Sequence, residues 1–346
     1  MQAIRFHQHG GPEVLRYESA PDPVPGAGEI LLRVRACALN HLDLFVRDGI
    51  PGVPIPLPHI GGCDIAGQVA ELGPGVEAGR NGPAVGDAVI LSPGIGCGRC
   101  PACDACRENE CPRYTVLGYG VDGGYAELVK APAENALPLP AGLDFAAAAA
   151  VPLVFLTAWH MLRTRAGLQP GQQVLVWAAS SGVGSAAVQI AKWMHCRVIA
   201  TAGGERKMEL AKRLGADEVL DHYRDPIAQR VKALTGGGVD VVFEHVGQAT
   251  WEQSVRSLAN GGTLVTCGAT TGPRAAIDLR HLFARQLRLV GSYMGPRSEL
   301  RELLPFIARG DLHPVVDRTF PLAETAAAQR YLQAKEQFGK VVVTLE

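Results

Sequence analysis

Short apolar or alternating runs of valine, isoleucine and leucine mark the first third of the chain, and each run is bounded by glycine or proline. Runs of this kind are typical of β-strands. They predict strands at residues 29–39, 64–72, 85–91 and 124–130. Because prolines are also concentrated in this part of the chain, we expect it to be turn-rich and mostly β.

From residue 172 the pattern changes to strands that alternate with amphipathic segments. The expected order is a strand at 174–178, a tight turn at 180–184, a helix at 185–194, a strand at 197–202 and a helix at 205–214. Further strands are expected at 239–244, 263–267 and 287–292. This alternation predicts a doubly wound parallel sheet. Helices at 298–308 and 323–335 and a strand at 340–345 should return to the first domain.

The composition indicates a soluble chain of about two domains. Of 346 residues, 47% are apolar and 19% charged, and the net charge is −1. The absence of a long basic run argues against a nucleic-acid partner and against an anionic membrane surface. The longest apolar run, 146–159, is too short to span a bilayer. The N-terminus lacks an apolar signal core, so we expect a cytoplasmic protein.

Five cysteines lie within fifteen residues, and four of them fit the spacing C-x2-C-x2-C-x7-C. These four are Cys97, Cys100, Cys103 and Cys111. Four thiolates make the closed tetrahedral shell of a structural zinc site and leave no position for a substrate. A disulfide loop would need an oxidising compartment, and a reactive redox cluster is the other alternative. Cys106 is either a spare thiol or a competitor of Cys103 for the metal.

The turn after the strand at 174–178 predicts a dinucleotide site. It contains Ser181, Gly182, Val183 and Gly184 directly before a helix, where free backbone N–H groups and the helix dipole attract phosphate. The spacing departs from G-x-G-x-x-G, since Ala179 and Ser181 stand where the first two glycines would be. A simple turn would also be rich in glycine, but its place in a βαβ repeat favours the cofactor.

The end of the next strand favours NADP(H) over NAD. An NAD site places an acidic residue there to bind the ribose 2′-hydroxyl. After Thr201 the chain has no Asp or Glu before Glu205, and Arg206 and Lys207 follow, well placed for a 2′-phosphate. The alternatives are NAD as cofactor and a basic pair that is merely solvated.

Together these regions resemble the medium-chain dehydrogenase/reductase superfamily, which contains zinc alcohol dehydrogenases and quinone oxidoreductases. The resemblance extends over the whole chain and rests on GGPEVL at 10–15, ALNHLD at 38–43, GGYAELV at 123–129, TCGA at 266–269, GSYMG at 291–295 and FGK at 338–340. It implies a GroES-like β domain at 1–152 with the zinc lobe at 93–113, a Rossmann domain at 153–291, and a C-terminal segment at 292–346 that completes the first domain.

The resemblance also implies further cofactor contacts. In addition to the residues of the turn, Thr201, Arg206 and Lys207, it points to His41, Thr157, Val246, Gly247, Gly268, Ala269, Tyr293 and Lys340.

The catalytic zinc of the family has no matching ligand set in this chain. Asn40 stands where the family has its first ligand, a cysteine. The usual Gly-His-Glu triplet, which carries the second ligand, is replaced by Gly62-Cys63-Asp64, and the third position aligns with Leu153. Asn40, Cys63 and Asp64 are therefore the candidate catalytic residues. An atypical second metal site would have to be built from Cys37, His41, His59, Cys63 and Asp64.

These features predict hydride transfer from NADPH to an activated double bond, a quinone or another carbonyl. Such a reaction needs an aligned hydride donor and a hydrogen bond to the substrate oxygen. One alternative is an alcohol dehydrogenase with an atypical metal site. The other is a thiol-based redox sensor that binds NADP(H). The substrate would be a small molecule, and the resemblance implies a homodimer or homotetramer.

Overall fold

The computed structural model describes residues 1–345, and the chain divides into two compact units. We call residues 154–295 the inserted unit, and residues 1–153 with the described residues from 296 onward the terminal unit. The sequence predicted that the chain leaves the Rossmann domain and returns to the first domain at residue 292. The structure keeps residues 292–295 in the inserted unit, because the Ser292 N–H donates to the Thr266 carbonyl at 2.8 Å and Gly295 packs on Leu156 and His160.

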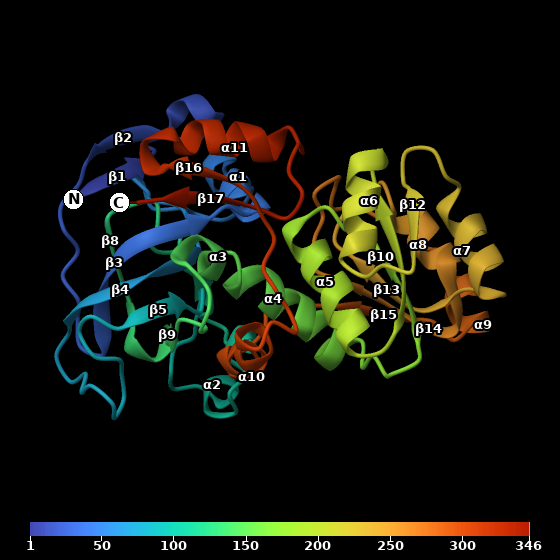
Figure 1. Cartoon of the computed structure of the whole chain (residues 1–346), viewed down its shortest axis with the longest axis horizontal. Coiled ribbons are helices and arrows are strands. Elements are labelled where there is room, and N and C mark those ends of the chain that lie inside the picture. Colours follow the sequence, from blue (N-terminus) through green and yellow to red (C-terminus); the bar gives the residue numbers. More distant parts are fainter. Residues whose placement is uncertain (346) are drawn as a thin grey trace. The chain divides into compact units, whose positions relative to one another are not determined.

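A six-stranded parallel sheet forms the centre of the inserted unit (Figure 1). Its strand order is β12-β11-β10-β13-β14-β15, so successive strands run outward in both directions from β10. This order confirms the doubly wound sheet that the sequence predicted. The strands are β10 (Gln173–Val176), β11 (Arg197–Ala202), β12 (Glu218–Asp221), β13 (Val239–Glu244), β14 (Leu258–Thr266) and β15 (Arg288–Gly291).

Helices follow the strands of this sheet, as the alternating pattern predicted. In Figure 1, α5 and α6 lie in front of the strands. The strand interiors are almost continuously apolar because a parallel sheet is covered on both faces; Val174, Leu175 and Val176 are all fully buried. The helices are α4 (Pro152–Trp159), continued by the π-helical turn His160–Arg165, α5 (Gly182–Trp193), α6 (Glu205–Arg213), α7 (Ile227–Thr235), α8 (Trp251–Ser257) and α9 (Leu279–Ala284).

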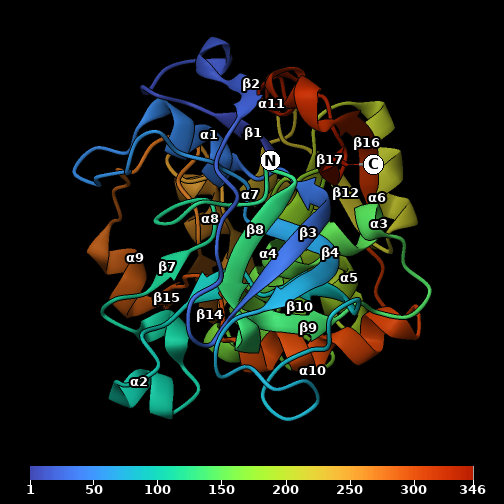
Figure 2. The same ribbon diagram turned by 90° about the vertical axis from the view of Figure 1, so that its left-hand side faces the viewer.

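The terminal unit is built on a seven-stranded sheet of order β16-β17-β3-β4-β5-β9, with β8 paired to β3. Figure 2 shows β8, β3 and β4 running side by side. The C-terminal strand β17 pairs with β3, with Val342 opposite Ala38, so residues from both ends of the sequence contribute strands to the terminal unit. The strands are β3 (Glu29–Ala38), β4 (Asp64–Leu72), β5 (Ala88–Leu91), β8 (Leu128–Pro132), β9 (Ala136–Pro138), β16 (Val316–Pro321) and β17 (Lys340–Thr344).

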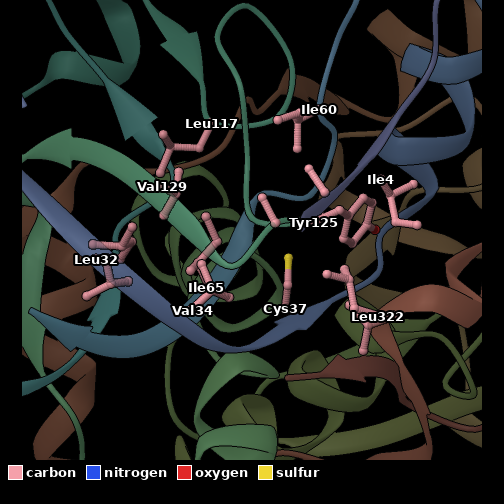
Figure 3. Packing of buried hydrophobic residues seen from close by; sticks show 14 of the residues in the cluster. Ile4, Leu32, Val34, Cys37, Ile60, Ile65, Leu117, Tyr125, Val129 and Leu322 are labelled. Carbon is pink, nitrogen blue, oxygen red and sulfur yellow. The ribbon is translucent and has the colours of Figure 1, made fainter. Parts of the chain in front are cut away.

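The core of the terminal unit gathers around the inner face of this sheet (Figure 3). The Cys37 sulfur points toward the region of the Tyr125 ring, and both side chains are buried. Gly62 has a φ of +95°, and a Cβ there would lie 2.7 Å from the Cys37 sulfur. Only glycine lets the backbone pass so close, which places Cys63 and Asp64 directly beside the core.

Smaller elements complete the terminal unit. They are β1 (Gln2–Arg5) paired with β2 (Arg16–Ser19), β6 (Gly94–Ile95) paired with β7 (Thr115–Val116), α1 (His41–Asp48), α2 (Pro101–Asp104), α3 (Phe145–Ala149), α10 (Arg297–Ala308), α11 (Thr325–Gln333), and 3-10 turns at Pro12–Val14, Glu108–Glu110, Ala133–Asn135 and Leu322–Glu324.

Several elements were not expected from the sequence, among them α1, β12 and β16. The two strands are four and six residues long, and strands this short carry little periodicity of their own. In the described part of the chain, none of the helices has the length and apolar character needed to cross a membrane.

Candidate functional site

The four cysteines of the predicted metal set come together in the lobe around α2. Across residues 1–345, Cys97, Cys100, Cys103 and Cys111 form the one group of three or more Cys, His, Asp or Glu residues whose potential ligand atoms all lie within 4.8 Å of one another. Cys106 is exposed and outside this group, with a left-handed φ of 53°. The four other sulfurs already make a complete tetrahedral shell, so Cys106 is not needed for one.

The quartet fits a zinc ion in both distance and chemistry. The sulfurs of Cys100 and Cys103 are 3.6 Å apart, and a tetrahedral zinc with bonds of about 2.3 Å needs sulfurs about 3.8 Å apart. The backbone N–H groups of Cys97 and Arg113 donate to the Cys111 sulfur at 3.4 and 3.3 Å. Such donors favour the thiolate form. The backbone N–H of Arg99 and the Arg113 side chain likewise lower the pKa of Cys97 to about 6, whereas desolvation raises the pKa of Cys103 to about 11.

The metal lobe is fastened to α10 by a buried glutamate. Glu108 accepts a hydrogen bond from the backbone N–H of Arg297, in the first turn of α10. The Arg297 guanidinium donates to Asn135 Oδ1 at 2.7 Å and pairs with Glu134 at 2.9 Å. Gly96 has both Cys103 and Glu108 packed against it. The cysteine shell and this anchor therefore share one loop.

The turn between β10 and α5 has the form required for a phosphate. Ser181 caps α5, and its hydroxyl accepts the Gly184 N–H at 2.9 Å. A Cβ at Gly184 would lie 2.3 Å from the Ala178 carbonyl, so this position requires glycine. The remaining N–H groups of the helix start, at Gly182 and Val183, are the ones that can receive pyrophosphate oxygens.

Thr201 supports this turn from the next strand. Its hydroxyl accepts the Ala178 N–H at 3.0 Å and lies 3.2 Å from His222 Nδ1. Thr201 is completely buried, so its hydroxyl acts on the site through the turn that it holds. Ala178 has a left-handed φ of 44°, and the Thr201 contact helps to fix that conformation.

Two further loops at the carboxyl ends of the strands carry expected cofactor residues. The buried Glu244 carboxylate accepts the N–H groups of Val246 and Gly247, both at 3.0 Å, and the Thr250 hydroxyl at 2.7 Å. These bonds preform the loop after β13. A Cβ at Gly247 would lie 2.8 Å from Ala269, so the loops after β13 and β14 pack directly together.

Other expected cofactor residues occupy varied environments. Gly268 lies against the backbone of His245. Thr157, on α4, has a buried hydroxyl without a hydrogen-bond partner in residues 1–345. Tyr293 is 54% exposed, and Arg206 and Lys207 stand in the first turn of α6, exposed and half-buried.

The sequence analysis did not identify two residues near the start of α6, His222 and Tyr223. His222 and Tyr223 follow β12, whose last residue pairs with Ala202 at the end of β11. A Cβ at Gly203 would lie 2.4 Å from the Tyr223 ring, and Tyr223 is 76% exposed. An exposed ring beside the expected 2′-phosphate position is suited to the adenosine end of a cofactor. A prediction of β12 would have pointed to these two residues, because they follow this strand, but the sequence pattern did not reveal it.

In the terminal unit, the three candidate catalytic residues meet in one buried polar network. Asn40 Nδ2 donates to Asp64 Oδ2 at 2.9 Å and to the Cys63 sulfur at 3.3 Å. The Lys340 ammonium donates to Asn40 Oδ1 at 2.6 Å and to Asp64 Oδ2 at 2.8 Å. The Leu153 N–H donates to Asp64 Oδ1 at 2.7 Å. The network thus unites Asn40, Cys63 and Asp64 with Lys340, which the sequence assigned to the cofactor.

A second carboxylate orders the backbone around this network. Asp43 accepts the Asn40 N–H at 2.6 Å and the Gly62 N–H at 3.1 Å. The first bond belongs to a capping box at the start of α1, which holds Asn40 as the N-cap and His41 as the first helical residue. Burial raises the pKa of Asp43 to about 6.

The donor set of the network does not fit a catalytic zinc. Asn40 presents a neutral amide that is already hydrogen-bonded, and Leu153 has no side-chain donor. Cys63 is left as the one thiol among these three positions, and one thiol makes no three-ligand site. The Lys340 ammonium also lies among these groups, where it would repel a dication.

Across residues 1–345, the residues of the alternative metal set do not form a group whose potential ligand atoms all lie within 4.8 Å of one another. His59 is buried, with Nε2 3.1 Å from the Gly118 carbonyl and Nδ1 3.6 Å from Asp122. Burial lowers the pKa of His59. Burial raises the pKa of Cys37 far above its usual range, and Cys37 belongs to the apolar core. The described structure therefore gives no support for a site built from these residues.

Comparison with known proteins identifies both units. Residues 26–141 match the family described as the alcohol dehydrogenase GroES-like domain, and residues 182–309 match the family described as zinc-binding dehydrogenase. These two matches agree with the GroES-like and Rossmann-like folds predicted from the sequence.

Three full-length relatives illustrate the range of this similarity. A crystal structure of an NAD-dependent alcohol dehydrogenase is 45% identical, with a TM-score of 0.96 and complete coverage of both chains. A mycobacterial protein complexed with NADPH is 32% identical, with a TM-score of 0.85 and complete coverage of both chains. A quinone oxidoreductase of Pseudomonas aeruginosa is 34% identical over 98% of each chain.

Proposed function

Because this chain belongs to the medium-chain dehydrogenase/reductase superfamily, and is an NAD(P)-dependent oxidoreductase, we propose that it uses NADPH to reduce small enones, quinones or related carbonyls. The reduced nicotinamide supplies the hydride when it is bound. The observation that carries the proposal is the donor set Asn40, Cys63 and Leu153, which offers a zinc ion no complete shell of anionic or imidazole ligands. An activated double bond needs less polarisation than an alcohol, whose proton must be removed.

The roles of the residues follow from their contacts. The N–H groups of Gly182 and Val183 would hold the pyrophosphate, with Ser181 and Thr201 keeping the turn in shape. Arg206 and Lys207 would bind a 2′-phosphate by charge-assisted hydrogen bonds. The structural zinc would be held by Cys97, Cys100, Cys103 and Cys111, at a distance in sequence from the catalytic network.

Zinc-dependent alcohol oxidation is the second candidate, since a relative 45% identical to this chain is called an NAD-dependent alcohol dehydrogenase. It would require a metal at the Asn40–Cys63–Asp64 network, either by displacement of Lys340 or by recruitment of ligands from elsewhere. The names of the relatives, a quinone oxidoreductase and an alcohol dehydrogenase, favour an enzyme over a thiol sensor.

A substrate panel separates these candidates. NADPH oxidation is measured with small enones and quinones, and reduction of NADP⁺ and NAD⁺ is measured with ethanol and benzyl alcohol. Each reaction is run with and without a chelator strong enough to remove accessible zinc. We expect enone or quinone reduction that the chelator leaves intact while the protein stays folded. Fast alcohol oxidation that the chelator abolishes without unfolding would refute the proposal. Light scattering after gel filtration would test the expected homodimer or homotetramer.

A further inference from the structure

The fifth cysteine of the metal lobe ends α2 in a conformation that normally selects glycine. The Cys106 N–H donates to the Cys103 carbonyl at 3.0 Å, and the Arg107 N–H donates to the Ala102 carbonyl at 2.8 Å. These two bonds form a Schellman motif, in which the residue after the C-cap is left-handed and most often glycine. Cys106 takes that position with a φ of 53°. Its β-carbon destabilises this conformation relative to glycine, so the thiol is carried at a cost to the turn.

Cys106 is also the most accessible thiol of the chain. Cysteine is among the residue types that are most often fully buried. Of the nine cysteines, all of which lie within residues 1–345, Cys106 alone is exposed, and the four of the quartet are half-buried or buried. An oxidant in solution therefore reaches Cys106 before it reaches the metal ligands.

The turn that presents Cys106 begins at a member of the quartet. The bond from the Cys106 N–H to the Cys103 carbonyl closes a turn whose end Cα atoms lie within about 7 Å. Disulfides join Cα atoms about 4.4–6.8 Å apart, so the backbone allows these two cysteines to be linked. The Cys103 sulfur belongs to the group whose ligand atoms lie within 4.8 Å of one another. Cys103 therefore has two alternative partners, the metal and Cys106.

We propose that Cys106 is an oxidation site through which a peroxide withdraws Cys103 from the zinc shell. The Cys106 sulfur attacks hydrogen peroxide, an S–O bond forms, the O–O bond breaks and water leaves, so that the thiol is oxidised to a sulfenic acid. The Cys103 sulfur then attacks the Cys106 sulfur, an S–S bond forms and the S–O bond breaks. The departing hydroxide takes a proton from solvent. One thiol, one thiolate, one proton and one peroxide thus give one disulfide and two water molecules.

The disulfide leaves an incomplete metal site. Cys97, Cys100 and Cys111 supply three sulfurs, whereas a structural zinc site needs four ligands. Zinc affinity therefore falls and the metal is released. The change is reversible, because thiols reduce a disulfide but do not reduce a sulfinic acid. This inference goes beyond the proposed function, and its readouts do not depend on which substrate the enzyme reduces.

The test follows zinc release with a chromogenic chelator after the zinc-loaded protein is treated with hydrogen peroxide. Cys106→Gly suits the left-handed position, so it should fold and hold about one zinc per chain. It should release zinc slower than wild type by about tenfold or more, because the accessible attacking thiol is absent. Cys267→Ser is the matched control, since Cys267 is the one cysteine outside the lobe that is not buried, and it should release zinc at the wild-type rate.

Mass spectrometry of the oxidised wild type identifies the bond. Proteolysis before Asp104 separates Cys103 from Cys106 in the sequence, so a disulfide between them joins two peptides. Fragment ions then distinguish Cys103 from Cys100 as the partner. We expect the Cys103–Cys106 disulfide to appear at the rate of zinc release. Dithiothreitol with added zinc should restore both the thiols and the metal content.

Three results would overturn the proposal. The first is release of zinc from Cys106→Gly at the wild-type rate. The second is a disulfide between two cysteines of the quartet while Cys106 stays a free thiol. The third is oxidation of Cys106 with the zinc fully retained. If Cys106→Gly does not fold, Cys106→Ser gives the same comparison, because it also lacks the thiol and keeps a side chain of similar size.

Discussion

Replacing Cys103 by serine should weaken the structural zinc site and destabilise the terminal unit, whereas replacing Cys106 by serine should do neither. Cys103 belongs to the quartet whose sulfurs lie within 4.8 Å of one another, and Cys106 does not. A structural zinc contributes about 10–16 kcal/mol of apparent binding free energy at neutral pH. Shared over four ligands, this gives about 3 kcal/mol for one thiolate. For a unit of this size the loss corresponds to a Tm lower by roughly 6–12 °C.

The measurements are zinc content by mass spectrometry of the metal and Tm by differential scanning calorimetry. Wild type and Cys106→Ser should each hold about one zinc per chain, the number of complete four-thiolate sites. Hydrogen exchange gives a local readout, because Glu108 joins the lobe to the first turn of α10. In Cys103→Ser, amides near Arg297 should exchange faster, while those of β10 stay protected. Unchanged zinc and Tm in Cys103→Ser would refute the assignment, and equal damage from Cys106→Ser would show that the wrong thiol was chosen.

Two further predictions concern the cofactor and the capping carboxylate. Lys207→Ala should lower kcat/KM for NADPH about tenfold and leave that for NADH nearly unchanged, because a charge-assisted bond to the 2′-phosphate is lost; Lys212→Ala, on the exposed end of the same helix, is the control, and a native preference for NADH would contradict the prediction. The folded-state pKa of Asp43 is about 6, above its unfolded value of 3.8, so its stabilising contribution is complete below pH 3.8 and is lost as pH rises through 6. The Tm difference between wild type and Asp43→Asn should therefore shrink between pH 4 and pH 6, and a constant or growing difference would exclude this sign.

The zinc lobe and the cofactor turn were predictable because their residues are neighbours in sequence. The cysteine quartet spans fifteen positions, and tetrahedral zinc geometry restricts how such a loop can fold. The turn at Ser181–Gly184 is likewise set by a local capping bond and one close backbone contact. In both cases the chemistry is contained in one short segment, so spacing alone carries the information.

The polar network of Asn40, Cys63, Asp64 and Lys340 could be predicted only in part, for the opposite reason. Asn40 and Cys63 could be chosen by their places in a resemblance, but their hydrogen-bond partners depend on strand pairing. Lys340 reaches Asn40 across 300 residues, through the pairing of β17 with β3. The family motif assigned Lys340 to the cofactor. The sequence shows the type of this residue, but it does not show the pairing register of β17 with β3, which determines the contacts of the side chain. The pairing register of β17 with β3 also determines the role of Asn40. Its amide could be free to contact the substrate, or its oxygen could accept a hydrogen bond from the Lys340 ammonium and hold that group in place. The contacts favour the second role, because the Asn40 amide oxygen accepts a hydrogen bond from the Lys340 ammonium at 2.6 Å.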